Sequence, residues 1–149
     1  MSRWAPRVTV ATVVERAGRF LMVEEARGGP QTLFNQPAGH LEPGEGIRAA
    51  AEREVREETA WHVGITDYLG LYVYQAPDGL TFHSHGFAGM ALAHLGNDLD
   101  PDILATHWLT LEELEILEQA GRLKSPLVMR RIRDVTRGRS FPLDVIQER

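Results

Sequence analysis

Runs of apolar and β-branched residues predict two strands in the first part of the chain. Residues Val8–Val14 (VTVATVV) are apolar or β-branched at every position, which is typical of a buried strand. The pair Ala17-Gly18 predicts a turn into a second strand, Phe20–Glu24. We therefore expect these two strands to form a hairpin.

Alternating and β-rich segments recur after the middle of the chain. They predict further strands at Val63–Ile65, Tyr68–Gln75, Leu80–His85, Phe87–His94 and Thr106–Leu109. Ala76–Gly79 (APDG) is typical of a hairpin turn between the second and third of these.

Two helices are expected near the C-terminus. Thr110 and Glu113 have the spacing of a capping box, and Gly121 ends that helix. Ser125-Pro126 is typical of a helix start, and apolar residues then keep helical spacing up to Gly138. Strands, a helix, strands and then helices predict an α/β (α+β) fold with a mixed sheet between helices, in a single domain over residues 1–149.

The most informative stretch, Gly39–Trp61, combines a loop with an acidic helix that is expected to begin near Gly46. An α-helix advances about 100° per residue, so Glu54, Glu57 and Glu58 share one face. Such charge runs are ordinarily solvated surfaces. On this helix, however, the acidic face also carries the small and apolar residues, and neighbouring like charges destabilise it. A bound cation explains the pattern better, and carboxylates suit Mg²⁺ or Mn²⁺.

Composition narrows the class of protein. The 149 residues, of which 43% are hydrophobic, are enough for one domain with a sizeable core. The formal net charge of −5 gives no general attraction to nucleic-acid polymers. The chain has no cysteine, which excludes disulfides and thiolate metal sites, and no apolar run approaches the ~18 residues of a membrane span. We expect a cytoplasmic monomer or homodimer that has no membrane partner.

Residues 39–61 resemble the Nudix box. The resemblance is carried by Gly39, by Glu45 after five intervening residues, and by the segment 53–61 (REVREETAW) after seven more. Ala60 stands where the family has glycine just past the helix. The resemblance implies the Nudix fold and a hydrolase of phosphoanhydride bonds that depends on divalent cations.

The resemblance also implies roles for the acidic helix. Glu57 and Glu58 are expected as the primary metal ligands, and Glu54 as a further ligand or the general base. Arg53 is expected to orient the cluster by pairing with carboxylates such as Glu45.

Two expected contributions lie outside the helix. The loop before the box implies a metal-binding backbone carbonyl, here that of Ala38. Some Nudix enzymes take their base from the loop before a tryptophan. Beside Trp108 this chain has His107, and acidic residues lie upstream at positions 98, 100 and 102. Asp102 and His107 are therefore alternatives to Glu54 as the base.

Three residues are candidates for substrate contact: Arg7, Gln36 and Tyr74. Arg7 is either a strand-end charge or a phosphate ligand, and Tyr74 either stacks on a base or packs within the sheet. The last quarter of the chain is basic, and its residues either meet phosphates or form a solvated helix face. They are Arg122, Lys124, Arg130, Arg131, Arg133, Arg137 and Arg139.

Segments along nearly the whole chain (VTVATVV, FLMVEE, FNQPAGHLE, AAAEREVREET, LKSPLV and FPLDVI) resemble phosphatases of the same family. This resemblance implies Mg²⁺-dependent release of orthophosphate from nucleoside tri- and diphosphates and from hydroxymethylpyrimidine pyrophosphate. The alternatives are a nucleotide-pool cleaner, a nucleotide-sugar pyrophosphatase, or a ligand-binding module that has lost catalysis. The complete set of box carboxylates argues against the last of these.

Overall fold

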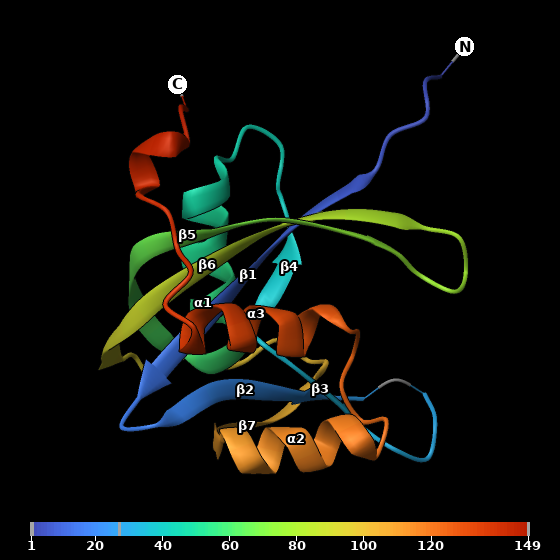
Figure 1. Ribbon diagram of the computed structural model, residues 1–149, viewed down its shortest axis with the longest axis vertical. Coiled ribbons are helices and arrows are strands. Elements are labelled where there is room, and N and C mark those ends of the chain that lie inside the picture. The colour runs from blue at the N-terminus through green and yellow to red at the C-terminus, as the bar shows by residue number, and fades with distance from the viewer. Residues whose placement is uncertain (1, 27, 149) are drawn as a thin grey trace.

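Within residues 2–26 and 28–148, which the computed structural model describes, seven strands form one mixed sheet (Figure 1). The elements are β1 (Arg7–Arg16), β2 (Arg19–Glu25), β3 (Leu33–Asn35), β4 (Ala38–His40), α1 (Ile47–Thr59), β5 (Trp61–Gln75), β6 (Thr81–His94), β7 (Ile103–Thr110), α2 (Leu111–Gln119), α3 (Leu127–Thr136) and the 3₁₀ helix η1 (Leu143–Val145). In this part of the chain no helix is both long and apolar enough to cross a membrane.

The central strand β1 holds the rest of the sheet together. It runs parallel to β6, with Arg7–Val14 opposite Phe82–Gly89, and antiparallel to the short strand β4. Its residues Val10–Val14 are buried because both faces of the strand are covered there. The predicted strand Val8–Val14 is thus confirmed, and it extends to Arg16.

The four separate strands predicted between residues 63 and 94 are in fact two. β5 and β6 form one long antiparallel pair, with the predicted turn at Ala76–Gly79 between them. The pairing shifts between Ile65 and Asp67 and again between Tyr68 and Gly70. A β-bulge inserts an unpaired residue and interrupts the alternation of side chains without ending the strand, so the sequence pattern was wrongly divided.

The predicted hairpin of β1 and β2 is confirmed only at its tip. Ala17 and Gly18 both have positive φ angles, as a two-residue turn requires. The two strands pair at only two positions, Glu15 with Phe20 and Arg16 with Arg19. Beyond the tip they separate, and β2 pairs with β7 over most of its length.

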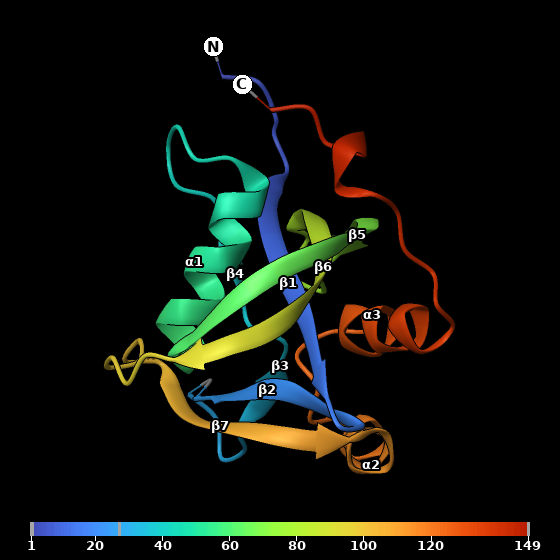
Figure 2. The ribbon, with the colours of Figure 1, turned by 90° about the vertical axis from the view of Figure 1, so that its left-hand side faces the viewer.

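Helices cover both faces of the sheet, as predicted (Figure 2). α1 packs on one face against a core that includes Val10, Val55 and Phe87. α2 and α3 pack on the opposite face around Met22 and Ile132. The predicted capping box is present at the start of α2.

Both ends of α1 are held in unusual ways. Gly46, at its N-cap, has no side chain, and the carboxylate of Glu148 accepts a hydrogen bond of 2.7 Å from the Ile47 N–H instead. At the other end Ala60 takes the left-handed conformation, with φ of 62°, and its N–H donates to the Arg56 carbonyl at 2.9 Å. The alanine thus fills a cap that normally favours glycine, at a cost in backbone strain.

Candidate active site

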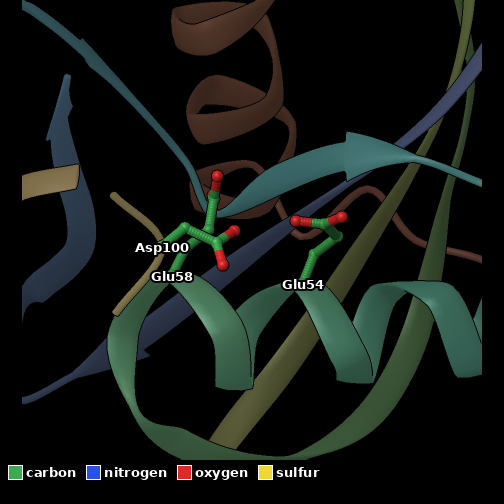
Figure 3. Close-up of side chains that lie close together, drawn as sticks. All are labelled: Glu54, Glu58 and Asp100. Carbon is green, nitrogen blue, oxygen red and sulfur yellow. The ribbon is translucent and has the colours of Figure 1, made fainter. Parts of the chain in front are cut away.

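Three carboxylates meet beside α1. Glu54, Glu58 and Asp100 each offer an oxygen, and these oxygens all lie within 4.8 Å of one another. Glu54 and Glu58 project from successive turns of α1, and Asp100 comes from the segment before β7 (Figure 3). A backbone hydrogen bond of 3.0 Å from the Asp100 N–H to the Glu57 carbonyl fixes that segment against the helix.

Strand β4 lies directly against these carboxylates. The Ala38 N–H donates a hydrogen bond of 2.9 Å to Oε1 of Glu58. A Cβ atom added at Gly39 would lie only 2.2 Å from the Glu54 carboxyl group. The glycine of the box is therefore needed for the close approach of the backbone to Glu54.

Arg53 connects the acidic residues of the helix and of the preceding loop. Its guanidinium donates to Glu45 at 2.7 Å, to Glu54 at 2.8 Å and to Glu57 at 2.9 Å. It also donates to the backbone carbonyl of His40 at 2.9 Å. The expected pair between Arg53 and Glu45 is present, and the same side chain fixes the loop, the helix and β4 relative to one another.

The environment of the cluster disfavours negative charge. Burial, followed by the charges of Glu54 and Glu25, raises the pKa of Glu58 to about 8 despite the Ala38 hydrogen bond. Burial, opposed by Arg53, raises the pKa of Glu54 to about 7. Burial and the charge of Glu57 also raise the pKa of Asp100. Hard oxygen donors that repel one another in this way fit a divalent cation such as Mg²⁺ or Mn²⁺.

The cluster differs in membership from the ligand set expected by resemblance. Glu54 and Glu58 are in it, whereas Glu57 lies at its rim and is held by Arg53. Asp100 was not among the candidates. Its only signal in the sequence is the acidic run at positions 98, 100 and 102, which does not tell which residue turns inward. The side chain of Asp102, an expected alternative base, is exposed and outside the cluster.

The structure places His107 away from the carboxylates. Its Nε2 lies 2.9 Å from Oε1 of Glu24, and its ring contacts Phe34. The neighbouring Trp108 packs on the α1 side of the sheet. Because side chains alternate along a strand, His107 faces the opposite side, so its position does not favour a role as the base.

A cleft of about 380 Å³ adjoins the cluster where β4 lines both. Tyr74 is in its wall, which agrees with its candidacy for substrate contact. Arg7 is exposed beside the rim residue His40, and burial, followed by the charges of Arg7 and Lys124, lowers the pKa of His40. The residues that line the cleft are Thr9, Asn35, Ala38, Gly39, His40, Tyr74, Ala76, Pro77, Asp78, Phe82, Ser84, Lys124, Ser125, Leu127 and Arg131.

Gln36 does not reach the cleft. Its side chain is fully buried and is hydrogen-bonded at both ends, donating to the Val128 carbonyl at 2.8 Å and accepting from Nη1 of Arg131 at 3.1 Å. The expectation that Gln36 contacts the substrate is therefore not supported by its position. It supports Arg131, which lines the cleft.

The acidic helix lies against a mixed sheet and beside a cleft. Sequence comparison agrees with this arrangement: the NUDIX domain family matches residues 4–131, and the chain belongs to that family. It is a hydrolase that acts on phosphoanhydride bonds. The predicted Nudix resemblance is confirmed.

Individual relatives agree with this assignment. The chain is 40% identical over 143 residues to Phosphatase NudJ of Escherichia coli K12, covering 95% of this chain and 90% of that protein. It matches the structure of a NUDIX hydrolase from Nitrosomonas europaea with a TM-score of 0.91 and 37% identity, covering 97% and 98% of the two chains. A MutT protein from Methanosarcina mazei, with a TM-score of 0.69, 22% identity and coverage of 92% and 99%, shares the fold.

Proposed function

We propose that the protein is a Mg²⁺-dependent phosphohydrolase that releases orthophosphate from nucleoside tri- and diphosphates and from small pyrophosphates such as hydroxymethylpyrimidine pyrophosphate. The observation that carries the proposal is the convergence of Glu54, Glu58 and Asp100 beside β4, which also lines a cleft large enough for the organic part of such a substrate. The likeness to a protein named as a phosphatase supports orthophosphate as the product.

Glu54, Glu58 and Asp100 would hold the divalent cation, with Glu57 and the Ala38 carbonyl as further candidate ligands. A bound cation supplies neutralisation of phosphate charge and lowers the pKa of water. Arg53 keeps Glu54 and Glu57 in fixed rotamers through its hydrogen bonds. Without that link the two carboxylates would repel each other and separate.

Glu54 is our candidate for the general base. Its carboxylate lies against Gly39 at the boundary between the cluster and the cleft. Burial raises the pKa of Glu54 to about 7 in the metal-free protein, and a bound cation would favour the ionised carboxylate, which is the form that accepts a proton. In this role an Oε atom of Glu54 accepts the proton of the attacking water.

The test is hydrolysis of a panel of nucleoside triphosphates, diphosphates and hydroxymethylpyrimidine pyrophosphate with Mg²⁺, with orthophosphate and pyrophosphate measured separately. We expect orthophosphate as the main product and loss of turnover in Glu58→Gln. Glu52→Gln is the matched control, because Glu52 lies on the same helix but is half-exposed and pairs with Arg48. Full turnover by Glu58→Gln would refute the metal role, and pyrophosphate as the main product would refute the phosphatase assignment.

A further inference from the structure

Arg131 differs from the other basic residues of the C-terminal region because it is inside the protein. It projects from α3 with only 4% of its surface exposed, and it lines the cleft. Its neighbour Arg130 is exposed, and Arg133 pairs with Glu118 at the surface. Helical spacing explains the burial: Arg131 follows the buried Leu127 by four residues and so lies on the apolar face of α3.

The hydrogen-bonding capacity of Arg131 is only partly used. An arginine side chain has five N–H donors. Nη1 donates to Oε1 of Gln36 at 3.1 Å and Nη2 donates to Oγ of Ser84 at 2.7 Å. The buried Nε has no partner. This Nε is shielded from solvent. Among the described residues, no hydrogen bond uses the second N–H of Nη1 or of Nη2, and Arg131 lines the cleft, so these two groups are the donors available to a ligand.

The charge of Arg131 is also uncompensated. Among the described residues, no carboxylate lies within 4.0 Å of its nitrogens. The Tyr72 ring, 5.4 Å from its Cζ, gives partial compensation, but the Tyr72 hydroxyl is turned toward Asp134, to which it donates at 2.6 Å. A buried charge without a partner is destabilising, and a neutral residue of similar shape would serve as well for packing. The guanidinium is therefore better explained by a ligand than by stability.

The walls around Arg131 suit a flat ring. The side chains of Tyr74 and Phe82 line the cleft from the two strands of the β5–β6 hairpin, and Leu127 adds an apolar surface. Among the described residues, the lining contains one other lysine or arginine, Lys124, and it has a carboxylate, Glu25, at 3.6 Å. A second phosphate group would need several free charges, whereas a planar heterocycle needs apolar walls and a few donors at its edge.

We propose that Arg131 determines base specificity, by donating from its unused N–H groups to two adjacent acceptors on the edge of a heterocycle that lies beside Tyr74 and Phe82. The proposal rests on the proposed function, since it concerns the nucleotide that the cleft accepts. Guanine offers O6 and N7 as such a pair, and cytosine offers O2 and N3. Uracil carries a donor at N3, and adenine carries an amino donor beside its ring acceptors, so neither can receive both hydrogen bonds.

The experiment compares kcat/KM within two pairs of substrates of nearly equal shape, CTP with UTP and GTP with 7-deaza-GTP. The first pair tests cytosine and the second tests the N7 acceptor of guanine. Because a good bidentate contact discriminates between bases by roughly tenfold or more, we expect at least one pair to differ by that factor in the wild-type enzyme. Ratios near one in both pairs would overturn the proposal.

Variants separate recognition from structure. In the pair that the wild-type enzyme discriminates, Arg131→Met and Arg131→Lys should bring the ratio of the two kcat/KM values toward one. The lysine variant should do so because an ammonium lacks the planar fork of a guanidinium. Arg130→Met, on the exposed face of the same helix, should leave it unchanged. If the Arg131 variants instead lower kcat/KM equally for all four substrates and keep the wild-type ratio, Arg131 is only structural and the proposal fails.

The proposed function can fail separately. If the wild-type protein hydrolyses none of the four nucleotides, that function is wrong as stated. The dissociation constants of the four nucleotides are then measured by calorimetry and compared within the same two pairs. Tighter binding of CTP than UTP, or of GTP than 7-deaza-GTP, that is lost in Arg131→Lys would still support the recognition. Equal binding within both pairs would refute it.

Discussion

Replacing Glu58 with glutamine should stabilise the metal-free protein while it removes activity. Glu58 is 7% exposed, and burial raises its pKa from the ordinary 4.5 to about 8. The folded state therefore binds this proton more tightly than the unfolded state does. The stability from the protonated group is present at low pH and is lost as the pH rises through about 8. Glutamine keeps an oxygen for the Ala38 N–H and does not ionise.

The size of the effect follows from the shift. Since one pKa unit corresponds to about 1.4 kcal/mol, the wild-type protein should lose roughly 3 kcal/mol of stability between pH 5 and pH 8 relative to Glu58→Gln. The advantage of the variant should therefore be small at pH 5 and largest at pH 8. Bound Mg²⁺ should reverse it, because the cation favours the ionised carboxylate and stabilises the folded wild type.

The assay is urea unfolding of both proteins from pH 5 to pH 8, with EDTA and with Mg²⁺. Glu52→Gln, at a half-exposed position of the same helix, controls for the chemical change itself and should follow the wild type. If the free energies of unfolding of wild type and Glu58→Gln change in parallel with pH in EDTA, burial does not disfavour the ionised form of the Glu58 carboxyl. The explanation of the acidic cluster as a group of carboxylates that repel one another until a cation binds would then be refuted.

Three further substitutions test the supports of the cluster. Gly39→Ala would place a Cβ atom against the Glu54 carboxyl, and since small misplacements of catalytic groups cost about 100-fold, steady-state kinetics should show kcat reduced by that order. Arg53→Met leaves its bound carboxylates unpaired, and urea titration should show a loss of about 3 kcal/mol in stability; an unchanged midpoint would contradict this. Glu148→Ala removes the cap of α1 and should cost about 1 kcal/mol, with faster hydrogen exchange at the Ile47 amide; unaltered exchange there would argue against the cap.

The acidic face of α1 could be predicted from sequence because the rotation per residue in a helix is fixed. Glu54 and Glu58 are placed together by that rule alone. Asp100 could not be predicted, since the choice among three acidic loop residues depends on contacts of the loop with distant segments, such as the hydrogen bonds from the Asp100 N–H to the Glu57 carbonyl and from Asn97 to the Arg56 carbonyl. Loops lack a fixed period, so spacing within them carries little information about direction.

The basic C-terminal region shows a different limit. The sequence grouped Arg131 with the basic residues around it, which were expected either to meet phosphates or to form a solvated helix face. The buried partners that accept from it, Gln36 and Ser84, lie 95 and 47 residues away in the chain. Such long-range polar contacts follow from the packing of α3 on the sheet, which local patterns do not define.

The β5–β6 hairpin carries one wall of the cleft, whereas α1 and the segment at Asp100 carry the carboxylates. The register of β6 is fixed by β1 over Phe82–Gly89, so the turn at Ala76–Gly79 and the residues beside it are free to vary in length and composition without moving the acidic cluster. The acidic cluster and the residues proposed to select the base, Arg131 of α3 and the hairpin residues Tyr74 and Phe82, thus lie on separate segments. A change of length or composition in this hairpin would therefore alter one wall of the cleft and leave the carboxylates where they are.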